Sequence, residues 1–358
     1  MPADDFLMEE HLDAAVGNIL QAVISPAELH ERLRPPRTRI VKSKGTDYKT
    51  FTVRTGDKAV IRMGGATYRV LNALTSTAAT YFVADEHGRR PSTYWPAARD
   101  RLAAAIDSYA SPLRSPSVRP IDISPRQVTA ATSFAQYAYR FIICHELAHV
   151  ALEHTFGAGA DPDDVDSLRA SQDEELSADA FALRLQLGSL PHPDLIVTAL
   201  SAPVYFIFLL RAFDDFRLAL LSQLVDHEQW AIEYSHPPYL HRILNLMREA
   251  TASVSDDAGE GLAAVQGALE ELVQNVWSAA LESRDKVAAK ATELLADPKP
   301  ADAPKLTKLL AKSPIGVLQA LDANQQWRQP TWPFHTTVPT ELTTFLKLSR
   351  SDRARSIA

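Results

Sequence analysis

An uninterrupted helical stretch constrains this chain more than any other feature. No Gly or Pro occurs from Ala130 to Phe156, and the residues there are mostly apolar, which predicts a buried helix. The pattern His-Glu-x-x-His lies inside it. Its histidines, His145 and His149, are one turn apart on one face, the spacing at which two imidazoles hold one metal ion. A buried, unpaired cluster would be costly, and a metal removes that cost. The alternative is a pair of hydrogen-bonded histidines on a core helix.

The two residues beside the first histidine have different expected roles. Glu146 lies about 100° round the helix from His145, too far to be a third ligand on the same axis. It can still reach the open coordination position and act as a general base. Cys144, the only cysteine, points off the metal face, and we interpret it as small core filling.

A second segment supplies the acids that such a site needs. Residues 172–183 read QDEELSADAFAL, and we expect a helix that opens there with acidic residues in its first turn. Glu175 and Asp179 are four residues apart and share a face. We interpret Glu175 as the third metal ligand and Asp179 as the acceptor for the free N–H of a ligand histidine. Glu174 competes for the ligand role, but Ala178 rather than an acid follows it one turn later. The alternative is an ordinary acidic helix start.

These motifs resemble those of the gluzincin metallopeptidases. In that group a Glu in a Glu-x-x-Ala-Asp element, on a following helix, completes His-Glu-x-x-His; residues 145–149 (HELAH) and 175–179 (ELSAD) match both. Residues 235–243 (SHPPYLHRI) are similar to the Ser/Thr-His-Pro…Arg-Ile element of the HtpX/CAAX-prenyl-protease branch. The resemblance covers roughly residues 125–250. It implies a zincin-like catalytic core and Zn²⁺ as the cofactor.

The third motif adds a further candidate catalytic residue, His236. Pro237 disfavours the helical conformation at His236, so its ring would lean into a cleft and donate a hydrogen bond to the oxyanion of the tetrahedral intermediate. The alternative is a structural histidine at a helix start. The membrane helices of the HtpX branch are not evident, so a resemblance to soluble relatives, such as the Lit-like phage-exclusion peptidases or other bacterial regulatory gluzincins, fits as well as one to a membrane protease. Metzincins are excluded, because Leu152 and Thr155 stand where that family has Gly and its third His.

Composition bounds the cell compartment and the partners. At 358 residues the chain is long enough for two or three domains, and its 46% apolar content is enough for a hydrophobic core. The net charge of −7 argues against general nucleic-acid binding. A single cysteine suits a reducing compartment, and the N-terminus lacks the features of a signal peptide. The longest apolar run, from Leu195 to Leu210 with Pro203 inside it, is shorter than a membrane span. We expect a buried helix there, no membrane span and a cytoplasmic protein.

Pattern changes divide the chain into three expected parts within an α+β, predominantly helical fold. Residues 1–124 would hold short N-terminal helices within 6–34 and, from 38 to about 74, a small antiparallel sheet with strands near 39–42, 50–54 and 59–63. The sheet region is basic, with eleven Lys/Arg against three Asp/Glu from residue 30 to 69. This is either a solvated strand face or a docking patch for an acidic partner or nucleic acid, whose binding would be sensitive to salt. By analogy with gluzincins, the sheet edge would pair with an extended substrate.

The other two parts are a zincin-like catalytic core, residues 125–250, and a helical accessory region, residues 251–358. We expect a linker over residues 251–261, a long amphipathic helix over 262–295 and shorter helices around 306–310 and 317–321. The accessory region could cover the cleft or recruit a regulatory protein partner.

Together these features predict a zinc-dependent hydrolase, a metalloprotease that cuts a protein or peptide substrate, selectively and in the cytoplasm. His145, His149 and Glu175 would hold the metal, and Glu146 and His236 would be catalytic. The rival is a non-catalytic zinc-binding scaffold or regulator that acts through the C-terminal helices or the basic sheet. Glu146 argues against it, since a structural zinc site needs no general base.

Overall fold

A computed structural model gives the structure of the chain. It describes residues 38–42, 51–55, 58–64, 67–85, 87–88, 95–111, 123–154, 165–188, 190, 196–221, 239–253 and 256–348. Helices predominate in this part of the chain, and one small sheet lies near its N-terminal end. The predicted α+β, predominantly helical class is therefore confirmed. The helices expected within residues 6–34 lie outside the described residues.

The chain forms two compact units, each assembled from several separate segments. The first contains residues 1–72, 131–207 and 232–269, and the second contains residues 73–130, 208–231 and 270–358. Four of the described helices, at residues 67–82, 125–151, 196–221 and 256–296, contain residues of both units. The division into three consecutive parts at residues 124 and 250 stays a prediction, which limited proteolysis would test.

The sheet of the first unit has three strands in the order β1-β3-β2. They are β1 (Thr38–Lys42), β2 (Phe51–Thr55) and β3 (Lys58–Met63), close to the predicted ranges. The β2–β3 pair is antiparallel as expected, whereas β1 pairs with β3 in parallel. Alternate β3 residues Ala59, Ile61 and Met63 are buried, so one face of the sheet is packed and one is open.

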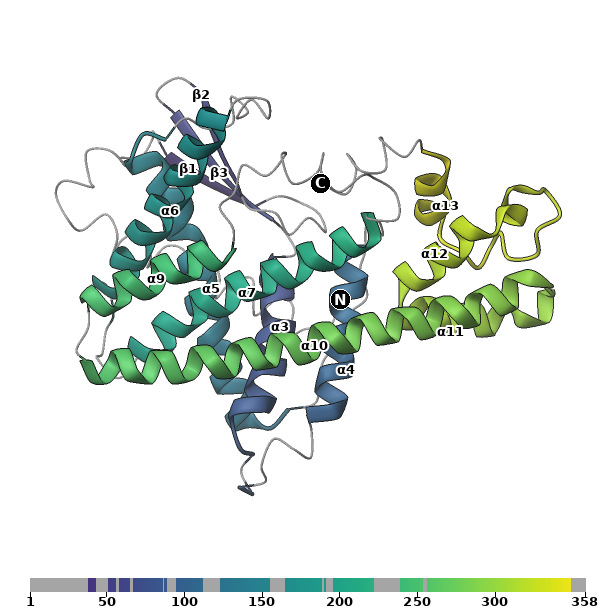
Figure 1. Ribbon diagram of the computed structural model, residues 1–358, viewed down its shortest axis with the longest axis horizontal. Helices are drawn as coiled ribbons and strands as arrows, with labels where there is room; N and C mark the ends of the chain where they lie inside the picture. The colour runs from purple at the N-terminus through teal and green to yellow at the C-terminus, as the bar shows by residue number, and fades with distance from the viewer. Residues whose placement is uncertain are drawn as a thin grey trace. The chain divides into compact units, whose positions relative to one another are not determined.

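Four helices form most of the rest of the described first unit, and two of them, the first and the third along the chain, also contain residues of the second. They are α5 (Pro125–Ala151), α6 (Val165–Gly188), α7 (Ile196–Leu221) and α9 (Tyr239–Ser253), with the first residues of α3 and α10. Helix α9 packs along α6 (Figure 1), burying Ile243, Leu246 and Ala250 at helical spacing. Helix α6 begins seven residues before the predicted start at residue 172, because no Gly or Pro interrupts residues 165–187. The acids near Glu175 therefore lie in the helix interior, and the expectation that they occupy its first turn is wrong.

Helix α7 confirms the predicted buried helix and passes through Pro203. A proline cannot donate to the carbonyl four residues earlier, here that of Ala199. The side-chain amide of Gln186 on α6 donates to this carbonyl instead, at 2.6 Å. All three residues are buried. A buried carbonyl that would have lost its partner is thus satisfied by a neighbouring helix.

All the regular secondary structure in the described residues of the second unit is helical. It contains most of α3 (Thr67–Phe82), α4 (Trp95–Ala110) and most of α10 (Asp256–Ala296). The C-terminal helices follow: η3 (Pro300–Asp302), α11 (Ala303–Lys312), α12 (Pro314–Ala323), η4 (Gln325–Arg328) and α13 (Thr340–Lys347). The sheet pattern predicted up to about residue 74 ends at Met63, since α3 already begins at Thr67. The expected linker over residues 251–261 is also wrong: α9 continues to Ser253, and α10 begins at Asp256.

Within the second unit, α12 packs on α4 through a buried polar contact. The Asp107 carboxyl group of α4 accepts from the Ser313 hydroxyl and from the backbone N–H of Ile315, the latter at 3.0 Å. Ser313 is also the N-cap of α12 and accepts from Gly316. A side chain at Gly316 would meet the Arg284 carbonyl of α10 at 2.6 Å, so only glycine allows this approach. Among the described residues, no helix is both long and apolar enough to cross a membrane.

Candidate metal centre

Helix α5 carries three polar residues into the core of the first unit. His145, Glu146 and His149 expose only 9%, 7% and 9% of their surface. The apolar side chains of Phe141, Ile142, Ile143, Cys144, Leu147 and Ala148 surround them along the helix and are buried too. Burial raises the pKa of the Cys144 thiol to about 12, which supports its predicted role as inert core filling. Buried polar groups need partners, and these come from other elements.

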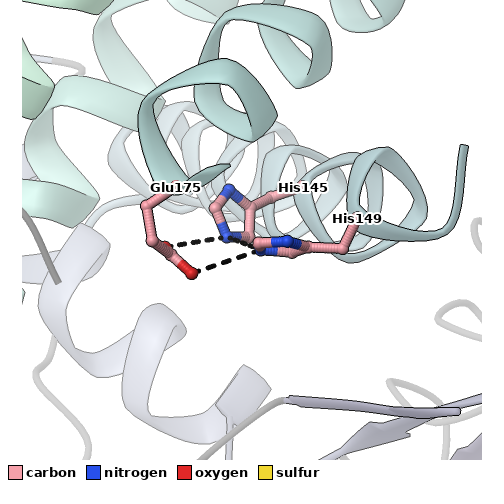
Figure 2. Close-up of side chains that lie close together, drawn as sticks. All are labelled: His145, His149 and Glu175. Carbon is pink, nitrogen blue, oxygen red and sulfur yellow. Dashed lines mark hydrogen bonds and ion pairs between the residues drawn. The ribbon is translucent and has the colours of Figure 1, made fainter. Parts of the chain in front are cut away.

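Glu175 on α6 reaches across to both histidines of α5 (Figure 2). Its Oε2 lies 3.4 Å from His145 Nε2, and its Oε1 lies 3.3 Å from His149 Nε2. The two Nε2 atoms are 3.1 Å apart. The three residues can each offer one ligand atom within 4.8 Å of the others, and they form a candidate metal site.

These spacings fit one tetrahedral zinc ion. Ligand atoms about 2.0–2.1 Å from zinc, at tetrahedral angles, lie about 3.3–3.4 Å from one another. The distances of 3.1, 3.3 and 3.4 Å agree with this within the tolerance expected for a site. Two imidazoles and one carboxylate are also a donor set typical of catalytic zinc, with the fourth position left for water or substrate. The predicted ligands therefore fit the metal.

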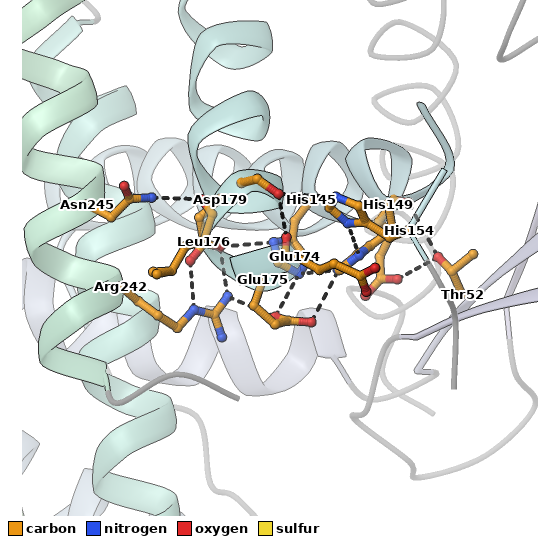
Figure 3. Close-up of polar contacts among 12 residues, drawn as sticks. Thr52, His145, His149, His154, Glu174, Glu175, Leu176, Asp179, Arg242 and Asn245 are labelled. Atoms are coloured by element: carbon orange, nitrogen blue, oxygen red, sulfur yellow. Dashed lines mark hydrogen bonds and ion pairs between the residues drawn. The ribbon is translucent and has the colours of Figure 1, made fainter. Parts of the chain in front are cut away.

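A buried ion pair between Asp179 and Arg242 contacts His145 on its Nδ1 side (Figure 3). Asp179 Oδ1 lies 2.9 Å from His145 Nδ1, so the other ring nitrogen of His145, Nε2, is the one that faces the ligand cluster. Arg242 on α9 donates two hydrogen bonds of 2.7 Å to Asp179 and lies 3.8 Å from Glu175. The bidentate geometry is the strong form of this pair.

The charges around His145 oppose one another. Burial alone would lower the pKa of His145, but its contacts with Asp179 and Glu175 raise that pKa to about 10. Burial likewise favours neutral Asp179, and Arg242 outweighs it, so the pKa of Asp179 lies below its usual value. The site therefore attracts positive charge at the position between His145 and Glu175. A proton and a metal cation compete for that position.

Glu146 has a partner from the sheet. Thr52 on β2 donates a hydrogen bond of 2.6 Å to Glu146 Oε2, and its hydroxyl also lies 3.5 Å from the Glu146 carbonyl. Thr52 is opposite the fully buried Ile61 in the sheet register, and cross-strand partners point to the same face. The packed face of the sheet therefore directs Thr52 at the metal-site helix.

His154 lies directly behind His149. Its Nδ1 is 2.9 Å from His149 Nδ1, and its Nε2 is 3.1 Å from the hydroxyl oxygen of Ser177 on α6. The Ser177 hydroxyl also donates to the Glu174 carbonyl at 2.9 Å. Burial and the neighbouring His149 lower the pKa of His154, which favours its neutral form.

The structure brings most of the predicted site residues together. His145, His149 and Glu175 form the ligand cluster, Asp179 contacts His145, and Glu146 faces Thr52. Glu174, the competitor for the ligand role, contributes its carbonyl to Ser177 instead. His236 lies outside the described residues, and its catalytic role stays a prediction.

Sequence reasoning missed Thr52 and His154. Thr52 is 94 residues from Glu146, and nothing in its neighbourhood distinguishes it from other strand threonines. His154 follows His149 by five residues, beyond the end of the helix, where helical periodicity predicts no shared face. The length of an unbroken apolar segment gave no signal of where α5 ends.

A comparison with protein families agrees with this geometry. The family model described as Peptidase U49 matches residues 111–263, a segment that contains α5, α6, α7 and α9 with every ligand candidate. The match supports a peptidase. No curated protein and no solved structure matches the chain. The matched segment ends before most of the C-terminal helices and begins after the sheet that carries Thr52.

Proposed function

We propose that the chain is a zinc-dependent peptidase of gluzincin type, with His145, His149 and Glu175 as metal ligands. The observation that carries the proposal is the convergence of their three ligand atoms at the spacings of tetrahedral zinc. A buried carboxylate, that of Glu146, follows the first histidine. The Peptidase U49 match over the same helices supports the reaction class.

The chain's own side chains divide the catalytic work. A zinc ion bound there would polarise the scissile carbonyl and lower the pKa of a water to about 7. Glu146 accepts a proton from the attacking water and later delivers it to the leaving amine nitrogen. Thr52 engages Glu146 Oε2, so we assign the proton to Oε1. Asp179 holds the Nδ1–H of His145 and keeps that ring in its ligand tautomer.

The sheet offers a place for a peptide substrate. Strand β2 is at an edge of the described sheet, and its residue Thr52 contacts the general base. An extended peptide that adds to this edge would run beside Glu146, its backbone paired by hydrogen bonds. We propose a protein or peptide substrate bound in this way, and a selective cytoplasmic target is our expectation.

Metal content and turnover test the proposal together. Elemental mass spectrometry of the purified wild type should find about one zinc per chain, and His149→Ala and Glu175→Ala should lose it. Glu146→Gln should keep zinc but cleave a quenched peptide library at least about 100-fold more slowly, because a general base contributes about 10²–10⁴ to the rate. His241→Ala, at an exposed position of α9, is the matched control and should behave as wild type.

Two results would contradict the proposal. A folded wild type that takes up no zinc even after reconstitution would leave the cluster as hydrogen-bonded core histidines. Glu146→Gln with wild-type turnover would remove the general base from the mechanism. Zinc binding without cleavage of any peptide or protein would favour the non-catalytic scaffold instead.

A further inference from the structure

The backbone conformation at the end of helix α5 sets the position of His154. The N–H of His154 bonds to the His149 carbonyl at 3.1 Å, and the N–H of Glu153 bonds to the Val150 carbonyl at 3.3 Å. These two bonds, together with a residue in the left-handed conformation directly after the helix, form a Schellman motif. The left-handed residue is Glu153, at φ 58°. A non-glycine residue there costs about 1 kcal/mol or more, so the turn that returns His154 to His149 is strained.

Within the described residues, the hydrogen-bond chain from His149 through His154 and Ser177 to Glu174 has one direction that uses all three of its contacts. A carbonyl oxygen can only accept, so the Ser177 hydroxyl hydrogen points to the Glu174 carbonyl. The hydrogen between Ser177 and His154 must then come from His154 Nε2. A neutral His154 with its hydrogen on Nε2 has a lone pair on Nδ1.

That lone pair sets the tautomer of His149. Its Nδ1 lies 2.9 Å from His154 Nδ1 and has to carry the hydrogen of that contact. The His149 Nε2 therefore presents a lone pair towards His145 Nε2, 3.1 Å away. Asp179 makes the same assignment for His145. In these two tautomers the lone pairs face each other beside the Glu175 carboxylate, and a cation has to lie between them, either a metal ion or a proton.

We propose that His154 is the positioning residue of His149: with Ser177 as its anchor, it accepts the Nδ1–H of His149 and fixes the tautomer that binds the metal. This rests on the proposed function for the metal itself. His145 and His149 would then be oriented by different chemistry, a carboxylate for the first and a neutral imidazole for the second. Outer partners of this kind set ligand orientation and basicity.

The test measures zinc affinity rather than turnover. His154→Phe keeps the ring but removes the acceptor, and it should weaken zinc binding about 10- to 100-fold in a chelator competition. His154→Asn places an amide oxygen near the position of Nδ1 and should stay within a few-fold of wild type. Ser177→Ala should weaken binding by a smaller factor, and Ser177→Thr, which keeps the hydroxyl, should restore it. His241→Phe controls for the substitution itself.

A spectroscopic signature separates positioning from a loss of packing. In zinc-loaded wild type labelled with nitrogen-15 histidine, the Nδ1–H of His149 should give a slowly exchanging NMR signal, assigned through its correlations within the His149 ring. The signal should persist in His154→Asn and disappear in His154→Phe. Ser177 is exposed, so its variants remain informative if His154→Phe does not fold.

The outcomes distinguish this inference from the proposed function. Wild-type affinity and an unchanged His149 signal in His154→Phe would overturn the positioning role while the zinc site stands. Equal losses in His154→Phe and His154→Asn would also overturn it, because packing rather than the acceptor would then be responsible. A wild type that binds no zinc would overturn the proposed function, and this inference with it.

Discussion

At the scale of single residues, the candidate site is a set of buried polar groups that are each held from a different element. Arg242 of α9 holds Asp179, Asp179 holds His145, and Thr52 of β2 holds Glu146. Removing one member of a buried charge pair costs about 3–5 kcal/mol because the other is left uncompensated. The Thr52–Glu146 contact differs, since only one partner is charged and its removal would affect the reactive carboxylate directly.

Thr52→Val should lower kcat without releasing the metal. The substitution keeps the β-branched shape but removes the hydroxyl, and a hydrogen bond to a charged group contributes about 1.5–3 kcal/mol, equivalent to roughly 10- to 100-fold in rate. Steady-state kinetics beside the zinc content of the same preparation would measure this. Thr52→Ser retains the donor and should recover most of the rate. An unchanged kcat in Thr52→Val would show that this contact does not position the base.

At the scale of elements, a side chain of one helix in the first unit supplies a hydrogen bond that the backbone of a neighbouring helix lacks. Pro203 removes a helical donor from α7, and Gln186 of α6 replaces it at the Ala199 carbonyl. The same helix α6 also carries Glu175 and Asp179. The amide therefore fixes α6 against α7 at a buried point about three helical turns from the candidate ligand Glu175.

The substitution Gln186→Leu should lower the free energy of unfolding by about 1–3 kcal/mol, the cost of a buried carbonyl without a partner. In a Pro203→Ala background the loss should be smaller by about 1 kcal/mol, because the backbone N–H of the new alanine can serve the Ala199 carbonyl. Urea unfolding of the four proteins of this cycle measures the difference. Equal losses in both backgrounds would mean that the amide does not compensate for the proline.

At the scale of the whole molecule, segments far apart in sequence complete each unit. Asp107 and Ser313 are 206 residues apart and form a buried contact in the second unit. Burial outweighs the hydrogen bonds from Ser313 and Ile315 and the nearby charge of Arg284, and it raises the pKa of Asp107 to about 7. A carboxyl that keeps its proton in the folded state links folding to pH.

The contribution of Asp107 to the stability of the fold decreases as the pH rises. In the unfolded chain Asp107 loses its proton near pH 4, whereas in the folded protein it keeps it up to about 7. The contribution of Asp107 to stability is therefore complete below pH 4 and is lost as the pH rises towards 7, by up to about 1.4 kcal/mol per pH unit. Asp107→Asn cannot titrate but can still accept from Ile315 and donate to Ser313.

We therefore expect Asp107→Asn to lose less stability than wild type between pH 4 and 7. Denaturant unfolding of the full chain at several pH values would measure both slopes. Other ionisable groups contribute equally to the two proteins, so the difference between the slopes isolates Asp107. Parallel pH profiles would show that its carboxyl is already ionised in the folded state.

Local patterns in the sequence were sufficient to predict the helices and the ligand faces. A helix repeats its faces every three or four residues, so His145 with His149, and Glu175 with Asp179, could be paired without knowing any neighbour. The strand ranges and the long C-terminal helix followed from the same kind of periodicity. The start of α6 and the junction of α9 with α10 could not be placed, because small and acidic residues are compatible with both helix and linker.

The sequence by itself therefore determined which side chains share a face, and only the tertiary structure decided which faces meet. The partners of the site come from separate elements, Thr52 from β2, Arg242 from α9 and Ser177 from α6. Their placement depends on packing between elements, which no local period encodes. The return of His154 to His149 depends on a strained helix ending at Glu153, where local preference opposes the structure and the surrounding contacts prevail.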